Sequence, residues 1–352
     1  MSPWLALAGL SLAAVASGAL VQRVLCRGER RRFRPPGIRV DASGLALHFQ
    51  LAGEGAPTVV LDAALAGTSL SWSEVQPGVA AFTRVASYDR GGFGWSDPSS
   101  EPRRVDCLVA ELRRGLKALS LEPPYVLVGH SYGGFVAKLF WSRHPEEVAG
   151  VVLVDVPHPR KWVTPSASER RRIRRGARVA RVAGFLAHFG ITRFFFRLAG
   201  RRRLGNLPGL LSKLPAPSRA AIRSFWVRPS TLRALSSLVE EAPRSATLVE
   251  RATKDLEDRP LVVLTASDPS PERIRDQEEE ARRSRCSRHV IAERSGHWIP
   301  LDEPELVVEA IREVVTEARR LQGSGAFSNG PGGPGEPGEE ETPEARTTPS
   351  GP

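Results

Sequence analysis

A serine flanked by glycines is the strongest chemical signal in this 352-residue sequence. The apolar run Tyr125–Val128 leads into Gly129–Gly133, whose middle residue is Ser131, and the apolar stretch Phe135–Ala137 follows. A Gly-x-Ser-x-Gly spacing between a strand and a helix is typical of a nucleophile elbow, a sharp turn that exposes the serine hydroxyl. The helix N-terminus behind it would direct backbone N–H groups at a developing oxyanion. The pattern predicts that Ser131 is a nucleophile; a glycine-rich turn without chemistry is the alternative.

The elements around this turn alternate between strand-like and helix-like runs, which predicts an α/β protein with a doubly wound, mostly parallel sheet. The later strand candidates are continuous apolar runs, which suit strands covered on both faces. The predicted strands are Ile38–Asp41, Leu45–Leu51, Thr58–Asp62, Arg84–Asp89, Tyr125–Gly129, Gly150–Asp155, Pro260–Ala266 and His289–Ala292. The predicted helices include Val105–Leu119, Phe135–Ser142 and Glu303–Leu321.

Three motifs in this order resemble the α/β-hydrolase superfamily, in its serine-nucleophile, esterase- or lipase-like branch. The first is the Gly129–Gly133 turn. Residues Tyr88–Asp97 look like the family's D-x-x-G-x-G-x-S turn after the fourth strand. Residues Ser295–Trp298, followed by Asp302–Pro304, look like its S-G-H turn and the helix after it. The resemblance covers residues 38–321 and implies the α/β-hydrolase fold.

The resemblance also implies a base and an acid. His297 lies beyond the last strand and after the serine in chain order, so it is the candidate that accepts the Ser131 proton and returns it to a leaving group. The family commonly places its carboxylate after the strand that here includes Leu261–Leu264, which favours Asp268. Some members take the acid from the end of the preceding strand, where this sequence has Asp155. We expect Asp268 to orient His297, with Asp155 as the alternative.

By analogy with the family, the backbone amides of Leu65 and Tyr132 should form the oxyanion hole. Many members have His-Gly after the third strand, whereas this sequence has Ala63-Ala64, a departure that can tighten the approach of a substrate. A serine nucleophile, in place of the aspartate of epoxide hydrolases and haloalkane dehalogenases, implies an acyl-enzyme. Ester, thioester, amide or lactone substrates follow from that intermediate. No metal or organic cofactor is indicated.

The N-terminus has the composition of a membrane anchor. The 19 residues Pro3–Val21 carry no charge, and about 1.5 Å per residue is just enough to cross roughly 30 Å of hydrocarbon. Basic residues follow this run and none precedes it, so the positive-inside rule places the catalytic domain in the cytoplasm. A secretory signal peptide cleaved near Ala14–Ala16, giving a secreted protein, is the main alternative. We assign residues 1–25 to the anchor and residues 26–37 to a basic linker that ends in prolines.

Positive charge is concentrated in one segment. Between residues 157 and 233 there are nineteen Lys or Arg residues and one acid, Glu169. This stretch has no convincing strand, so we expect a helical, Arg-rich cap at 157–258 inserted into a core of 38–156 and 259–322. No groove-reading motif accompanies the charge, which argues against nucleic acid. The Gly-, Pro- and Glu-rich residues 323–352 are predicted to be a disordered tail.

The cap also carries many aromatic residues, and basic residues beside a Phe/Leu stripe suit contact with anionic lipid. The alternative is that the stripe packs on the active site. The residues predicted to form an apolar lid over the serine are Phe185, Phe189, Phe194, Phe195, Phe196, Phe225 and Trp226. The sequence therefore predicts a membrane-anchored serine hydrolase that cleaves a lipophilic acyl ester. A cofactor-free perhydrolase or thioesterase on the same triad, and a catalytically silent membrane-surface binding protein, are the alternatives.

Overall fold

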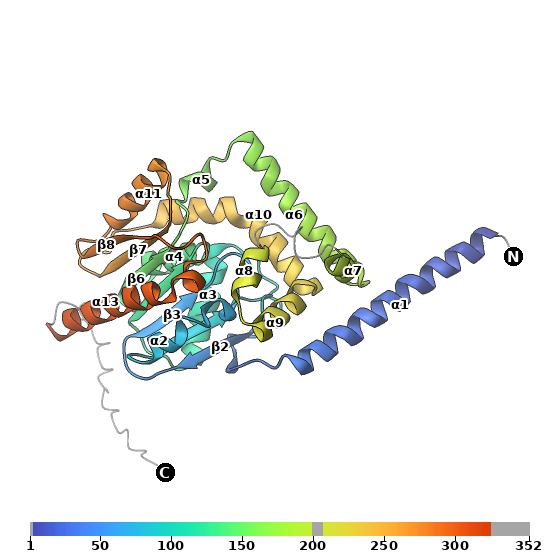
Figure 1. The fold of residues 1–352 in the computed structure, drawn as a ribbon, viewed down its shortest axis with the longest axis horizontal. Coiled ribbons are helices and arrows are strands. Elements are labelled where there is room, and N and C mark those ends of the chain that lie inside the picture. The colour runs from blue at the N-terminus through green and yellow to red at the C-terminus, as the bar shows by residue number, and fades with distance from the viewer. Residues whose placement is uncertain (1–2, 199–206, 325–352) are drawn as a thin grey trace, which may run out of the picture.

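A computed structural model describes residues 3–198 and 207–324 of the chain, with an eight-stranded sheet at its centre (Figure 1). The strand order is β1-β2-β4-β3-β5-β6-β7-β8; β1 pairs with β2 and β2 with β4 in antiparallel fashion, and the other pairs are parallel. The strands are β1 (Ile38–Asp41), β2 (Ala46–Ala52), β3 (Thr58–Asp62), β4 (Val85–Asp89), β5 (Tyr125–His130), β6 (Val148–Val154), β7 (Leu261–Ala266) and β8 (Ser287–Ala292). The predicted fold class is confirmed, and every predicted strand is present within two residues of its expected ends.

Helices cover both faces of the sheet, as the apolar strands require. Successive side chains of a strand point to opposite faces: Val126 of β5 packs in one apolar cluster with Ile311, whereas Leu127 packs in the other with Phe135. One face is covered by α2 (Gln76–Ala80) and α13 (Pro304–Gly323). The other is covered by α3 (Val105–Ala118) and α4 (Gly133–Arg143), with α11 (Pro271–Ala281) beside β7 and β8. Short helical turns are η1 (Ser69–Trp72), η2 (Pro145–Glu147) and α12 (Ile299–Asp302).

The described residues between β6 and β7 form helices and no strand, in the segment for which a cap is predicted. These helices are α5 (Arg160–Val163), α6 (Ala167–Ala187), α7 (Ile191–Leu198), α8 (Leu207–Lys213), α9 (Ala216–Trp226) and α10 (Pro229–Ala252). Helix α10 is shared between cap and core, because its Leu238 and Ala242 lie in the same apolar cluster as Leu108 of α3. Its Ser245 hydroxyl also accepts hydrogen bonds from the Tyr132 hydroxyl (3.0 Å) and the Val105 N–H (3.1 Å).

The N-terminal helix α1 (Pro3–Arg32) leaves the body of the molecule, with its first turns standing apart (Figure 1). Within the described residues, its segment Gly9–Arg32 is long and apolar enough to cross a membrane, and 6% of the most apolar window is buried. The helix continues through most of the predicted linker and ends shortly before Pro35-Pro36, since a residue that precedes proline disfavours helical geometry. The predicted tail, residues 323–352, lies outside the described residues from position 325 onward.

Candidate active site

Ser131 occupies a strained turn between β5 and α4. Its φ of 53° is in the left-handed region, which a residue with a Cβ adopts only where the surroundings hold it. The Ser131 N–H donates to the Val154 carbonyl of β6 at 2.9 Å. The flanking glycines are required by close backbone contacts: a Cβ at Gly129 would lie 2.5 Å from the Gly134 nitrogen, and one at Gly133 would lie 2.3 Å from the Asp62 carbonyl oxygen. The Gly-x-Ser-x-Gly spacing therefore forms the elbow that the sequence predicts.

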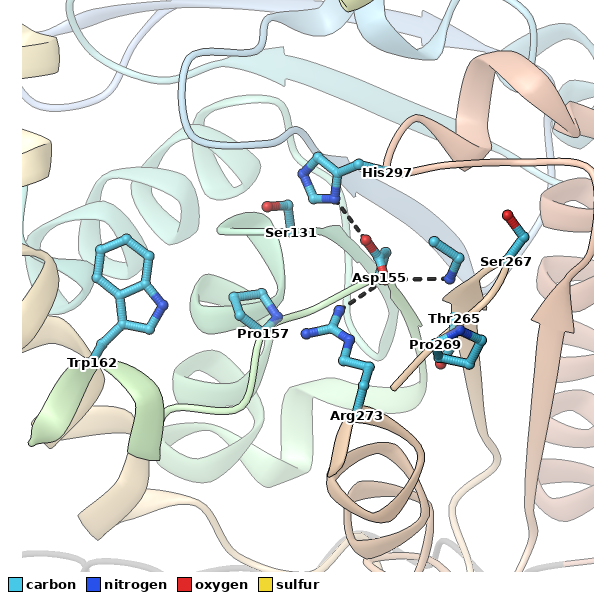
Figure 2. Close-up of a pocket in the computed structure, with 10 residues that line it drawn as sticks. Ser131, Asp155, Pro157, Trp162, Thr265, Ser267, Pro269, Arg273 and His297 are labelled. Carbon is cyan, nitrogen blue, oxygen red and sulfur yellow. Dashed lines mark hydrogen bonds and ion pairs between the residues drawn. The ribbon is translucent and has the colours of Figure 1, made fainter. Parts of the chain in front are cut away.

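Ser131 and His297 line one cavity of about 410 Å³, although they are distant in sequence (Figure 2). His297 follows β8, and its Nδ1 lies 2.6 Å from Oδ2 of Asp155, which follows β6. An ionised carboxylate can only accept a hydrogen bond, so the ring proton belongs on Nδ1. The Nε2 atom is then left with a lone pair that can accept a proton.

The structure corrects the predicted partner of His297. Asp155 lies against the histidine, whereas Asp268 is exposed on the turn between β7 and α11, so the expectation of Asp268 in this position is wrong. The sheet order explains the outcome, because β6 is the direct neighbour of β5 and its end lies beside the elbow. The turn after β7 is short, and the Ser270 hydroxyl caps α11 two residues after Asp268.

Arg273, on the first turn of α11, forms a second contact with the acid. Its Nη2 lies 2.8 Å from Oδ1 of Asp155, and the Ala266 N–H donates to the same oxygen at 3.3 Å (Figure 2). Burial by itself would raise the pKa of Asp155, but the hydrogen bond from His297 and the charge of Arg273 outweigh it and hold that pKa well below its usual range. Asp155 is therefore ionised at neutral pH and fixed at both oxygens.

The walls of the cavity are partly apolar. Trp162 of α5 and Pro157 stand on one side, and Ala266 and Pro269 line another part (Figure 2). The aromatic lid that the sequence predicts is not found in this form: Phe185, Phe194 and Phe195 are 64%, 58% and 58% exposed. Phe225 and Trp226 are buried in a separate cluster that reaches Trp298, the residue after His297.

His130 contacts the backbone of the loop that carries His297. Its Nε2 lies 2.7 Å from the His297 carbonyl oxygen, and the two rings are 4.9 Å apart between centroids. Burial and, to a smaller extent, the nearby His297 lower the pKa of His130 to about 3. His130 is therefore neutral at physiological pH, and its Nε2–H donates to the carbonyl.

The loop that carries Leu65 is held by a buried arginine. Arg90 follows β4, and its guanidinium bonds to the Asp62 carboxylate (2.5 Å), the Ala64 carbonyl (3.1 Å) and the Ala63 carbonyl. The Tyr88 hydroxyl donates to the other oxygen of Asp62 at 2.7 Å.

The hydrogen bond from Arg90 to the Ala64 carbonyl also fixes the direction of the Leu65 amide. In a trans peptide the C=O and the following N–H point in opposite directions, so a carbonyl of Ala64 held by Arg90 turns the Leu65 N–H away from the arginine. Neither the Leu65 N–H nor the Tyr132 N–H donates to an acceptor within the described residues. Both amides are thus available to a ligand.

Sequence reasoning missed two of these residues. Arg90 lies inside the recognised D-x-x-G-x-G-x-S turn, and its position directly after an apolar strand was a signal that it would be buried. Arg273 gave no such signal, since it is one of many arginines on polar helices.

Comparison with known proteins identifies the family to which the chain belongs. A model of the α/β hydrolase fold family matches residues 57–304. The Bacillus subtilis uncharacterized protein YbdG is 25% identical over 185 residues, which are 52% of this chain and 57% of that protein. Epoxide hydrolase 4 of Mus musculus is 32% identical over 125 residues, 35% of this chain and 34% of that protein. The chain thus spans from a third to just over half of these curated relatives.

Solved structures agree on the fold. An esterase of Thermogutta terrifontis superposes with a TM-score of 0.59 at 22% identity, over 80% of this chain and 98% of that one. At this identity the likeness concerns the fold alone. The match of the family model covers most of the chain and includes the elbow, the Asp155 turn and the His297 turn. The chain is a member of the α/β hydrolase fold family.

Proposed function

We propose that this protein is a serine hydrolase that cleaves a lipophilic acyl ester through an acyl-enzyme on Ser131. The observation that carries the proposal is the shared cavity of Ser131 and His297, with His297 Nδ1 bonded to an ionised Asp155 at 2.6 Å. A nucleophile, a base and a group that orients the base are the parts that acyl transfer requires. The family membership and the esterase among the structural neighbours agree with hydrolysis.

In this mechanism the Ser131 oxygen attacks the ester carbonyl carbon while its proton passes to Nε2 of His297. The ester C–O bond then breaks, and the alcohol leaves with that proton, so that the acyl group stays on Ser131. Water attacks the acyl-enzyme, gives a proton to His297, and releases the carboxylic acid as the proton returns to the serine oxygen. Asp155 stays ionised throughout and stabilises the imidazolium that forms in each half-reaction.

The Leu65 and Tyr132 amides are the proposed donors to the negative oxygen of each tetrahedral intermediate. The Tyr132 N–H lies at the start of α4, where the helix dipole adds to the stabilisation. Arg90 serves this site indirectly, as a positioning residue for the Leu65 amide. The alanine pair Ala63-Ala64 is compatible with this role, because backbone groups and not side chains contact the oxyanion.

The test is covalent labelling with a fluorophosphonate probe on the full chain. We expect the wild type to be labelled, and Ser131→Ala and His297→Ala to lose labelling with unchanged circular dichroism. Ser267 lines the same cavity, so Ser267→Ala is the matched control and should be labelled like the wild type. A folded wild type that is not labelled would contradict the proposal and favour the catalytically silent alternative.

Substrate class is tested by comparing acyl chains. The apolar walls formed by Trp162, Pro157 and Pro269 favour an uncharged, lipophilic acyl group. We expect kcat/KM for p-nitrophenyl esters to rise from acetate to medium-chain esters, and Trp162→Ala to weaken that preference. Higher kcat/KM for the matching thioesters would instead support the thioesterase alternative.

We also propose that α1 anchors the protein in a membrane with the catalytic domain in the cytoplasm. The uncharged run is followed by the basic residues Arg27, Arg30, Arg31 and Arg32, and large side chains on its first half are exposed. The cap approaches α1 where the uncharged run ends: a Cβ at Gly18 would lie 2.6 Å from the Phe189 carbonyl oxygen. Helices α6 and α7 meet there at 112°, and the exposed Phe194 and Phe195 are suited to contact the bilayer.

Flotation of the full chain with neutral phosphatidylcholine vesicles tests the anchor, and resistance to carbonate extraction distinguishes insertion from surface adsorption. Protein that stays in solution would contradict the anchor. A mature N-terminus that begins after Ala16 in cells would instead favour signal cleavage.

A further inference from the structure

A second cavity, larger than the catalytic one, lies between α1 and the cap. Its volume is about 650 Å³, which is in the range of small-molecule sites. Three elements supply most of its walls: the end of α1 at Glu29–Phe33, helix α7 at Arg193–Arg197, and helix α9 at Arg219–Val227. The catalytic residues take no part in it, so its function is separate from acyl transfer.

The lining of this cavity is strongly basic. It includes five arginines, Arg32, Arg193, Arg197, Arg219 and Arg223, and a single acid, Glu29. Glu29 is already used by Arg193, whose Nη2 lies 2.8 Å from its Oε2. The other four arginines form no ion pair with a carboxylate in the part of the chain that the structure describes.

The surroundings do not offset this charge. Arg228, directly after the cavity residue Val227, is buried, and burial together with the nearby Arg30 lowers its pKa to about 10. Its Nε and Nη2 have no hydrogen-bond acceptor within the described residues, although its Nη1 donates to the Gly94 carbonyl at 3.0 Å. The region therefore has an excess of positive charge, which an anion in the cavity would offset.

Apart from Ser212 and Ser224, the rest of the lining is apolar. Phe33 and Phe196 pack against an apolar cluster that includes Leu211 and Trp226, and all four line the cavity. A small inorganic anion would contact only the arginines and would leave these side chains against water. A ligand that combines an anionic head with hydrocarbon matches both parts of the wall.

The position of the cavity indicates the source of such a ligand. Glu29 and Phe33 lie about 12–18 Å along the helix from Val21, where the uncharged run of α1 ends. The contact of Gln22 with the Val227 carbonyl (3.0 Å) and with Arg193 (2.8 Å) fixes the cap to this part of α1. Basic pockets on the cytoplasmic side of a spanning helix are suited to anionic headgroups.

We propose that this cavity binds an anionic phospholipid, with its phosphate among Arg197, Arg219 and Arg223 and its hydrocarbon against Phe33 and Phe196. The proposal depends on the membrane attachment proposed above, but not on the chemistry of Ser131. The bound lipid would join α1 to the cap and fix the orientation of the catalytic domain at the membrane surface.

The test is binding of phosphatidylglycerol to the full chain in neutral detergent micelles, measured by native mass spectrometry. We expect saturable binding of one phosphatidylglycerol and little retention of phosphatidylcholine. The variant Arg219→Gln/Arg223→Gln should bind about 25-fold more weakly, since each basic residue near an anionic lipid contributes roughly fivefold. The matched control is Arg174→Gln/Arg175→Gln, which removes the same charge from exposed positions on α6 and should stay within about twofold of the wild type.

Three results would overturn the lipid site. Equally weakened phosphatidylglycerol binding in both double variants would indicate an effect of diffuse surface charge. Equal retention of phosphatidylcholine would show that the net negative charge of the lipid is not recognised. Displacement of the lipid by an equimolar amount of inorganic phosphate would indicate a site for a free anion. Fluorophosphonate labelling and flotation with neutral vesicles, measured on the same variants, should be unchanged, so that failure of the lipid site is distinguishable from failure of the triad or of the anchor.

Discussion

The cavity of Ser131 and His297 and the cavity between α1 and the cap both have arginines in or beside them, and they differ in what those arginines contact. In the catalytic region Arg90 bonds to Asp62 and to backbone carbonyls, and Arg273 bonds to Asp155. In the cavity between α1 and the cap, Arg219 and Arg223 have no carboxylate partner among the described residues.

The difference follows from burial. Arg90 is 4% exposed, and a charge removed from water to that extent requires a partner and hydrogen bonds. Such an arginine positions the atoms around it and is shielded from an external ligand. Arg223 is exposed and solvated, so it needs no internal partner and can meet an external anion. The buried Arg90 therefore holds residues around the candidate active site, whereas the exposed Arg223 is among the residues that we propose to contact a ligand.

The largest expected effect concerns the cavity of Ser131 and His297, where the charged side chains are paired. Asp155→Asn should lower kcat by about 10⁴-fold, because the amide favours the wrong tautomer of His297. Asp268→Asn is the control, since this residue is exposed and away from His297, and its kcat should stay within about twofold. Steady-state kinetics on a p-nitrophenyl ester gives both values. A larger loss in the Asp268 variant would reverse the assignment of the acid.

The second prediction, Arg90→Lys, changes the hydrogen bonds that hold the loop of Leu65. A lysine cannot hold Asp62 and two carbonyls together, so we expect kcat to fall about 10²-fold with little change in KM. Arg103→Lys is the matched control, because Arg103 is equally buried and paired with Glu111 at 2.6 Å. Both variants should lower the melting temperature, and only Arg90→Lys should lower kcat. Equal loss of kcat in both would reduce Arg90 to a stabilising residue.

The exposed surface of helix α7 is tested with Phe194→Ser/Phe195→Ser. These side chains are exposed, so unfolding free energy should change by no more than about 0.5 kcal/mol per residue. In a chain without residues 1–17, which keeps Gln22 but lacks most of the proposed anchor, partition onto anionic vesicles should fall about tenfold, because apolar contact with the bilayer is lost. Vesicle sedimentation and chemical denaturation supply the two measurements. A large loss of stability with unchanged partition would place these residues in the protein core instead.

The last prediction concerns the pH dependence of stability and not activity. Burial lowers the pKa of His130 to about 3, whereas an unfolded histidine titrates near 6.5. As pH falls from 6.5 toward 3, the unfolded state gains a proton that folded His130 does not, so stability decreases by up to about 1.4 kcal/mol per pH unit. His130→Gln keeps a donor for the His297 carbonyl and should weaken this dependence. Denaturation at several pH values checks the difference, and parallel curves for the two proteins would contradict it.

Several parts of the molecule were predictable from sequence because they depend on local signals. The strands are unbroken apolar runs, and the elbow combines glycine spacing with a strand before it and a helix after it. The contacts that the elbow needs are with backbone atoms, so only glycine fits at positions 129 and 133, and that restriction is visible in the sequence.

The carboxylate that contacts His297 was not determined locally. Asp155 and Asp268 both follow core strands in sequence, and both have positive φ in the structure. Which of them meets His297 depends on the sheet order and on the length of the turn after β7, and neither is encoded next to the aspartates. The same holds for Arg90, whose partners Asp62 and Ala64 are more than 25 residues away.

The sequence by itself determined the fold and indicated the candidate nucleophile and base, because strand periodicity and turn geometry act over a few neighbouring residues. Only the tertiary structure decided that Asp155 orients His297, that Arg90 holds the loop of Leu65, and that the arginines of the cap surround a cavity beside α1. The physical reason is that hydrogen bonds and ion pairs depend on distance in space. Packing of the sheet and the cap brings together residues whose separation along the chain carries no information about that distance.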